Sequence, residues 1–445
     1  MSGIVMILGL LALAAPAAAG QMAPRDSVKA ARAVVQELAT GEFAKVTTSF
    51  DNRMRAALPE ARLAAVWNAI EAQAGKFEGI RGVVVTDHGS RVILVCQFAH
   101  ARLDTILMFG PAGRIAGMFF RPGGKAAAWT TPSYAQPENF SERPVTVTTG
   151  QWKLPGTLTM PKGKGPFPGV VLVAGSGPED QDETIGPNKP FKDLAWGLAD
   201  RGIAVLRYAK RTYVYGTKSS MNPERLTIDD VTVNDARSAV ALLAREPGID
   251  PHRIYVLGHS LGATMAPEIA TGDPHVAGII LLAGAITPME RLVLEQIRTI
   301  DAREHVPAKT AEKQEAAVEA AVKQIESPSL KPGMMVDFLG SPMPASFWLS
   351  LRDYHPGPVA ARLHIPMLLL QGGRDYQVPP RQLELWKKAL AGHKNATYEV
   401  YPALNHLFEA GTGPSTPSGY MKPGRHVDVK VIDEVATWVK AEAGR

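Results

Sequence analysis

The feature that most constrains the fold is the pentapeptide GHSLG at residues 258–262, which directly follows the apolar run 253–257. The pattern G-x-S-x-G between a strand and a helix is typical of a sharp turn that exposes its serine at the end of the strand. The two glycines let strand and helix approach closely, where larger side chains would collide. A serine is a weak nucleophile until a base removes its proton, so the pattern also predicts a base elsewhere in the chain. Taken alone, Ser260 could equally belong to an ordinary turn.

The chain has 445 residues, which is too long for one ordinary hydrophobic core and predicts two domains. Its apolar fraction of 45% and its charged fraction of 20% are those of a globular protein. The net charge of +5 is a mild excess, and no block of like charges is long enough to form a nucleic-acid-binding arm. We therefore expect no nucleic-acid partner.

Residues 1–20 form an apolar N-terminal segment that ends in small residues. The apolar stretch 4–15 is followed by a proline and by three alanines at 17–19. This stretch is shorter than the roughly 20 residues of a bilayer span and is typical of a secretory signal peptide, cut near residue 19 or 20. The n-region has no lysine or arginine, which leaves an uncleaved anchor as the alternative. The sequence thus predicts a secreted or periplasmic protein, with no other segment suited to crossing a membrane.

The first part of the mature chain, residues 25–121, shows helical periodicity followed by strand-like runs. Apolar residues recur at three- and four-residue spacing within 28–38, and four strand-like runs come later. Helices followed by a small antiparallel meander predict a compact α+β domain. Cys96, the single cysteine, lies in one of these runs and is expected to be a buried, inert thiol. Residues 122–144 are rich in Pro, Gly and Ser and are expected to form a linker.

Residues 145–445 alternate strand-like and helix-like segments. Continuous apolar runs such as 169–173 are typical of strands that are buried on both faces, and helical patterns lie between them. Such alternation predicts a doubly wound, mostly parallel sheet with helices on both faces, an α/β fold. One long interruption, 285–362, follows a predicted strand end, where insertions commonly form lids over active sites. An insertion without a functional role is the alternative.

Two polar residues of the types that a serine nucleophile needs follow later predicted strands. Asp375 is the first carboxylate after the strand 365–370, and His406 is the first histidine after the strand 397–401. The carboxyl ends of parallel strands meet at one edge of a sheet, so both residues are expected to lie near Ser260. This chain order of nucleophile, acid and base is that of the α/β-hydrolase fold. The sequence therefore predicts a catalytic triad in which His406 is the base and Asp375 orients it.

Each member of this triad has a simpler explanation when it is taken alone. Asp375 could cap the predicted helix 379–390, and His406 could lie in a surface loop. Glu409 is a competing acid, but it lies only three residues after His406 and is poorly placed to orient that ring. Three residues of the right type at three expected strand ends make coincidence the weaker explanation.

The loop after the strand 169–173 is predicted to complete an oxyanion hole. The backbone N–H of Leu261 is expected to supply one donor and that of Ser176 the second, with Gly177 as the alternative. The Gly-x-Gly of this loop lacks the third glycine of a dinucleotide-binding loop. The sequence has no Walker A pattern, no HExxH and no cluster of His, Cys and Asp with metal-ligand spacing, so no cofactor and no metal are expected. The acidic stretch 179–183 is expected to be a solvated loop.

Residues 145–445 resemble the bacterial α/β-hydrolases of the carboxylesterase and serine-aminopeptidase-like group. The resemblance is carried by GSGPEDQDE at 175–183, GHSLG at 258–262, LHIPMLLLQGGRDYQV at 363–378 and the pair Asn405-His406. It implies the triad named above. Gln181 stands where the group often has a basic residue. The front domain resembles the small α+β domain of unknown role that precedes some of these hydrolases.

Together these features predict a serine hydrolase that cleaves carboxylic esters of short acyl chains through an acyl-enzyme intermediate. The expected partner is a small ester substrate. An aminopeptidase, thioesterase or lactonase on the same triad is the first alternative, because the motifs do not distinguish the leaving group. A catalytically silent module that binds envelope material through residues 25–121 is the second, although an intact triad argues against silence.

Overall fold

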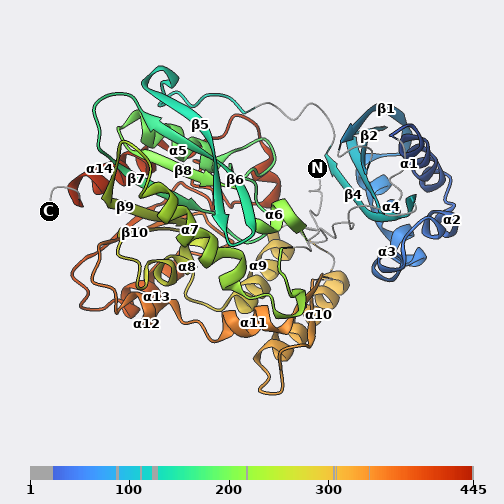
Figure 1. Cartoon of the computed structure of the whole chain (residues 1–445). Helices are drawn as coiled ribbons and strands as arrows, with labels where there is room; N and C mark the ends of the chain where they lie inside the picture. Colours follow the sequence, from blue (N-terminus) through green and yellow to red (C-terminus); the bar gives the residue numbers. More distant parts are fainter. Residues whose placement is uncertain are drawn as a thin grey trace. The chain divides into compact units, whose positions relative to one another are not determined.

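The computed structural model describes residues 24–86, 90–110, 113–122, 129–216, 219–303, 306, 308–339 and 341–442. The segment 1–20, for which we predict a signal peptide, lies outside these residues, as do residues 123–128 of the expected linker. The chain divides into two compact units, residues 1–126 and residues 127–445 (Figure 1). Each unit encloses a hydrophobic core of its own.

The first unit packs helices against an antiparallel sheet. Its helices are α1 (Pro24–Ala39), α2 (Phe43–Thr48), α3 (Asn52–Ala57) and α4 (Glu60–Ala74). Its strands are β1 (Phe77–Thr86), β2 (Arg91–Phe98), β3 (Arg102–Phe109) and β4 (Ile115–Pro122), paired in chain order. Trp67 of α4 packs against Phe77, Phe98 and Phe120 of the sheet. The expected helices and meander are confirmed, whereas α2 and α3 are too short for periodicity to reveal them.

Cys96 lies in the core of this first unit. Its side chain is fully buried in β2, and its Sγ lies 3.4 Å from Oγ1 of Thr105 on the neighbouring strand. Burial raises the pKa of the Cys96 thiol above its ordinary value, which disfavours the reactive thiolate. The residue therefore packs as a small apolar side chain.

The second unit is built on one large sheet. In its described residues, eight strands pair in the order β14-β13-β10-β9-β7-β8-β6-β5. Their bounds are β5 (Phe140–Thr149), β6 (Trp152–Pro161), β7 (Phe167–Val173), β8 (Ala204–Tyr208), β9 (Ile249–His259), β10 (Val276–Leu282), β13 (Met367–Gly372) and β14 (Ala396–Tyr401). Neighbours from β14 to β8 pair in parallel, and the hairpin β5–β6 joins β8 antiparallel. The expected mostly parallel sheet is confirmed.

Helices cover both faces of this sheet. One core contains α5 (Pro190–Asp200) and α14 (Val429–Glu442), and the other contains α7 (Asn234–Leu243), α8 (Leu261–Ala270) and α13 (Arg381–Ala389). Successive residues of β7 enter opposite cores, with Val170 and Leu172 in the first and Val171 and Val173 in the second. Burial on both faces explains the unbroken apolar run of this strand. None of the helices in the described ranges has the length and apolar character of a bilayer span.

The linker that we expected at 122–144 is shorter in the structure. Strand β5 begins at Phe140, directly after a 3-10 turn, and Trp129 packs edge-on against Trp196 of α5 and donates to Asp193 at 2.8 Å. β5 lies at the edge of the sheet, and its residues 141–144 are exposed. An exposed edge strand does not need an apolar alternation, and its first half therefore resembles a loop in the sequence.

The expected insertion 285–362 lies between β10 and β13 and runs from yellow to orange in Figure 1. It contains α9 (Met289–Arg303), α10 (Ala308–Glu326), the hairpin β11 (Met335–Phe338) and β12 (Ser341–Pro344), α11 (Ala345–Arg352) and α12 (Pro356–Ala360). Its apolar side chains, among them Val318, Ile325 and Trp348, join the same core as α8. The insertion is therefore an integral part of this unit, packed on the sheet face that carries α7 and α8.

Candidate active site

Ser260 occupies the turn between β9 and α8, at the carboxyl end of a central strand. Its backbone has φ 53° and ψ −117°, a conformation that is rare for a residue with a side chain. A Cβ atom added at Gly258 would overlap the backbone of Gly262, and one added at Gly262 would overlap the carbonyl oxygen of Val173. Only glycine fits at both positions, so the pentapeptide is a steric requirement of the turn. The strained turn leaves the serine side chain partly exposed.

Asp375 lies on the turn that follows β13, and its two carboxylate oxygens have different partners. Oδ1 accepts from the backbone N–H groups of Gln377 and Val378, at 2.8 and 2.9 Å. Oδ2 accepts from Nδ1 of His406 at 2.7 Å and from Nε2 of Gln371 at 3.4 Å. The residue is only 4% exposed, so these donors replace the lost hydration of the carboxylate. The two backbone N–H groups that donate to Asp375 lie in the turn before α13, not in the first turn of that helix. Asp375 is therefore not a cap of this helix.

His406 follows β14 and is buried against Asp375. Because Nδ1 of the ring is engaged by the carboxylate, Nε2 is the nitrogen that remains to act as a base. The ring centroid lies 4.6 Å from that of His259, the residue before Ser260. Within the described part of the chain, no hydrogen bond joins the ring to Ser260, and such catalytic contacts commonly tighten only when substrate binds. The structure thus joins His406 to Asp375 and brings this pair to the serine turn.

Asn405 and Glu409 shape the loop that carries His406. Oδ1 of Asn405 accepts from the N–H groups of Leu407 and Glu409 at 3.0 and 2.9 Å, and its Nδ2 donates to Glu409 at 3.1 Å. Phe408 takes a positive φ of 58° at the tip of this loop. Glu409, the competing acid in the sequence, therefore contacts Asn405 and helps to fix the loop.

The loop after β7 passes directly beside Ser260. The N–H of Gly175 donates to Oε1 of Glu183 at 2.7 Å, and its carbonyl accepts from Nζ of Lys210 at 2.6 Å. A Cβ atom at Gly175 would lie 3.2 Å from Cβ of Ser260. Since the N–H of Gly175 is engaged, an oxyanion donor from this loop has to come from a later residue, such as Ser176. Leu261, the other expected donor, is the first residue of α8, where backbone N–H groups have no acceptor within the helix.

Comparison with known proteins identifies the family. Residues 31–118 match a family described as a protein of unknown function, DUF3887, and residues 189–410 match one described as serine aminopeptidase, S33. Esterase EstD of Thermotoga maritima is 39% identical over 407 residues, which cover 91% of this chain and 93% of EstD. The chain belongs to the EstD esterase family. The match to EstD extends over both units described above.

Solved structures with similar folds include further esterases, at low sequence identity. Est1E from Butyrivibrio proteoclasticus is 15% identical with a TM-score of 0.43, and the match covers 68% of this chain and 99% of that one. The hyperthermophilic esterase from Pyrobaculum calidifontis is 16% identical with a TM-score of 0.41, over 68% of this chain and 86% of that one. The assignment of the α/β-hydrolase fold to this chain rests on the order of strands in its own sheet and on the turn that carries Ser260.

Buried charges around the site are the part that sequence reasoning missed. The acidic stretch 179–183 was expected to be solvated, yet Asp182 and Glu183 are buried. Asp182 is paired with Lys189 and Arg207, both at 2.7–2.8 Å, and Glu183 is paired with His259 at 2.9 Å. These carboxylates leave water because cations from other elements replace their hydration. The only signal in the sequence was the presence of acidic residues directly after the loop predicted to bind the oxyanion.

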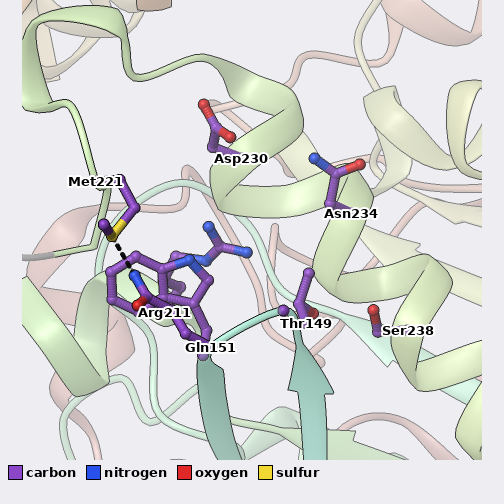
Figure 2. Close-up of a pocket in the computed structure, with 9 residues that line it drawn as sticks. Thr149, Gln151, Arg211, Met221, Asp230, Asn234 and Ser238 are labelled. Atoms are coloured by element: carbon purple, nitrogen blue, oxygen red, sulfur yellow. Dashed lines mark hydrogen bonds between the residues drawn. The ribbon is translucent and has the colours of Figure 1, made fainter.

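A separate hollow of about 580 Å³ lies beside α7 and the β5–β6 turn. Figure 2 shows its lining, which includes Arg211, Asp230, Asn234 and Ser238, with a hydrogen bond from Gln151 to Met221 across one side. None of the three predicted triad residues lines it. In the described residues, no three His, Cys, Asp or Glu side chains gather as metal ligands would.

Glu409 predicts a pH dependence of stability in this family member. Burial raises its pKa from 4.5 to about 7, although Asn405 donates to it. A folded-state pKa above the unfolded value favours folding below about pH 4.5, and this contribution is lost as the pH rises through about 7. Glu409→Gln keeps an acceptor for Asn405 and removes the charge. We expect the variant to match the wild type near pH 4 and to exceed its free energy of unfolding near pH 9 by up to roughly 3 kcal/mol.

Urea unfolding at both pH values measures this difference. The exposed Glu399→Gln on β14 is the matched control and should shift stability equally little at both. Equal stability of wild type and Glu409→Gln near pH 9 would show that Glu409 titrates as an ordinary surface carboxyl.

Proposed function

We propose that the protein is a serine esterase that hydrolyses carboxylic esters of short acyl chains through an acyl-enzyme, with Ser260, His406 and Asp375 as its triad. The observation that carries this proposal is the buried 2.7 Å hydrogen bond between His406 Nδ1 and Asp375 Oδ2, in a chain whose GHSLG turn presents Ser260 nearby. Membership of the EstD family supports the ester as the bond that is cleaved.

In the first half of the reaction, Ser260 Oγ attacks the ester carbonyl while Nε2 of His406 takes its proton. Asp375 fixes the tautomer, since its Oδ2 accepts the Nδ1 proton and leaves Nε2 unprotonated. The same carboxylate stabilises the imidazolium that forms. His406 then protonates the alcohol oxygen as it leaves, and the acyl group remains on Ser260.

The negative charge that develops on the carbonyl oxygen needs donors that are already in place. The N–H of Leu261 at the start of α8 and the N–H of Ser176 in the loop after β7 are our proposed donors. Both segments border Ser260. In the second half, water attacks the acyl carbon with His406 as the base, and the acid product leaves.

A cluster of bulky side chains beside the triad supports short acyl chains. Tyr376 and Leu407, each next in the chain to a triad residue, pack with Tyr420 and with Ile300 of the insertion. We expect these bulky side chains to limit the room for a long acyl chain beside Ser260. The family description of serine aminopeptidase favours one second candidate, cleavage of an aminoacyl amide on the same triad.

A panel of p-nitrophenyl esters from acetate to palmitate, together with aminoacyl p-nitroanilides, tests this proposal. We expect kcat/KM to be highest for the shortest esters and to fall as the chain lengthens. A fluorophosphonate probe should label the wild type at Ser260, as peptide mapping would show. Faster cleavage of the anilides than of any ester would favour the aminopeptidase, and no labelling with no ester cleavage would remove the proposal altogether.

We also propose that the protein is exported. The apolar stretch 4–15 and the small residues at 17–19 support a cleaved signal peptide, and therefore a secreted or periplasmic enzyme. The presence of one cysteine fits a fold whose stability comes from its cores rather than from disulfides.

A further inference from the structure

His259, the second residue of the pentapeptide, makes two buried hydrogen bonds, one to a carbonyl oxygen and one to a carboxylate. Its Nδ1 lies 2.9 Å from Oε2 of Glu183, and its Nε2 lies 2.9 Å from the backbone carbonyl of His406. The carbonyl oxygen can only accept. Oε1 of Glu183 accepts the N–H of Gly175, and an ionised Glu183 accepts the Nδ1–H of His259 on its Oε2. The arrangement is satisfied when His259 is an imidazolium and Glu183 a carboxylate.

The charge state of His259 follows from the same contacts. Burial alone would lower the pKa of His259, but the charge and hydrogen bond of Glu183 outweigh it, and the carbonyl of His406 adds to this, so the pKa is raised. The pair is nearly sealed from solvent, with His259 4% and Glu183 2% exposed. An ion pair of this kind is costly to break, because either partner alone would be an uncompensated buried charge.

Other buried charges face this pair from the elements around it. On the side of the loop after β7, Lys210 and Glu179 lie close, and burial together with Glu183 raises the pKa of Glu179 to about 7. Burial lowers the pKa of Lys210, which Glu179 and Glu183 partly offset. On the other side lie Asp375 and the ring of His406.

The contacts join two loops that the sheet does not join directly. Glu183 holds the loop after β7, where Gly175 lies, and His259 holds the loop after β14 through the carbonyl of His406. In the sheet, β9, β10 and β13 separate β7 from β14. Glu183 adopts a positive φ of 49°, a conformation that is costly for a residue with a side chain and that the surrounding contacts must maintain.

We propose that Glu183 and His259 form a positioning bridge on either side of Ser260. The bridge fixes the loop after β7, which contains the proposed oxyanion donor Ser176, relative to the loop after β14, which carries His406. The bridge touches no substrate and acts through Gly175 and His406. This inference rests on the proposed function, since it assigns a task to the geometry of that site. Misplacement of the base by even 1 Å is enough to slow a reaction that depends on near-attack geometry.

Two variants that remove the bridge and one that preserves it provide the test. Glu183→Ala and His259→Ala each break the connection, and we expect kcat to fall by about 10- to 100-fold with little change in KM. In Glu183→Gln, the amide oxygen can accept from Gly175 while the amide N–H₂ donates to a neutral His259, whose Nε2–H still reaches His406. We therefore expect Glu183→Gln to retain most of the wild-type kcat.

The pH profile separates positioning from general destabilisation. In His259→Ala, the carboxylate of Glu183 is left without its cation and favours the protonated ring of nearby His406. The acid limb of kcat/KM should then move to higher pH, whereas in Glu183→Gln it should stay at the wild-type position. The control is His426→Ala, which breaks a part-buried histidine–carboxylate pair with Asp193 and removes no hydrogen bond of Glu183, His259 or His406. It should lower the melting temperature without moving the acid limb.

The outcomes are distinguishable from a failure of the proposed function. If wild type neither cleaves esters nor binds a fluorophosphonate, the proposed function fails first. If wild type is active but Glu183→Ala and His259→Ala keep its kcat, or Glu183→Gln loses as much as Glu183→Ala, the bridge is overturned. Should Glu183→Ala fail to fold, Glu183→Asp replaces it, because its shorter side chain cannot reach Gly175 and His259 together.

Discussion

Ser260→Ala is expected to lower kcat for p-nitrophenyl acetate by about 10⁶-fold while leaving the protein folded. The substitution removes the oxygen that attacks the ester in the proposed mechanism, and alanine keeps the Cβ that packs against Gly175. Fluorophosphonate labelling should disappear together with turnover. Circular dichroism and the thermal midpoint, compared with those of wild type, measure the fold.

Ser238→Ala is the matched control for this change. Ser238 lies on α7 and lines the hollow of Figure 2, apart from the triad. We expect it to leave both kcat and labelling at wild-type levels. If Ser260→Ala kept its activity, Ser260 would have no part in the mechanism, and if Ser238→Ala alone raised KM, substrate would have to bind in that hollow.

Asp375→Asn is expected to lower kcat by about 10⁴-fold, although it replaces one oxygen by a nitrogen of the same size. The backbone N–H groups of Gln377 and Val378 hold Oδ1 in place, so the amide oxygen of the variant takes that position. Its N–H₂ then faces Nδ1 of His406 and donates to it. The ring proton is driven to Nε2, and the ring can no longer accept the proton of Ser260.

Steady-state kinetics over a range of pH measures this effect. KM should change little, because Asp375 is buried and is not expected to contact substrate, and activity should recover in part at high pH. Gln371→Leu removes the weaker 3.4 Å contact to the same carboxylate and should cost far less. A wild-type kcat in Asp375→Asn would mean that Asp375 serves only the turn at Gln377 and Val378.

The positions of Ser260, Asp375 and His406 at strand ends could be predicted because each depends on a local pattern. The glycines of the pentapeptide are a steric demand of one turn, and the apolar run before Asp375 marks a strand that is buried on both faces. The run before His406 is a half-exposed edge strand, recognisable by its β-branched and aromatic residues. Parallel pairing then brings the ends of the strands to one edge. The catalytic roles of the three residues remain predictions that the variants above address.

The interactions that hold the loops could not be predicted, because their partners lie far apart in the chain. Glu183 and His259 are separated by 76 positions, and nothing local distinguishes a buried carboxylate from a solvated one. The early start of β5 was missed for a different reason, since an edge strand carries no strict alternation. Patterns of hydrophobicity report which face is buried, not which charge pairs with which.

The placement of the insertion between β10 and β13 bears on how enzymes of this kind can diversify. Its helices and hairpin form one contiguous stretch of sequence, while Ser260, Asp375 and His406 all lie outside it. If the proposed triad is correct, exposed residues of that stretch can change and alter which molecules are admitted without moving the catalytic groups, whereas Val318, Ile325 and Trp348 are constrained by the core they share with α8. New substrate ranges can arise in such a lineage while its reaction chemistry is inherited unchanged.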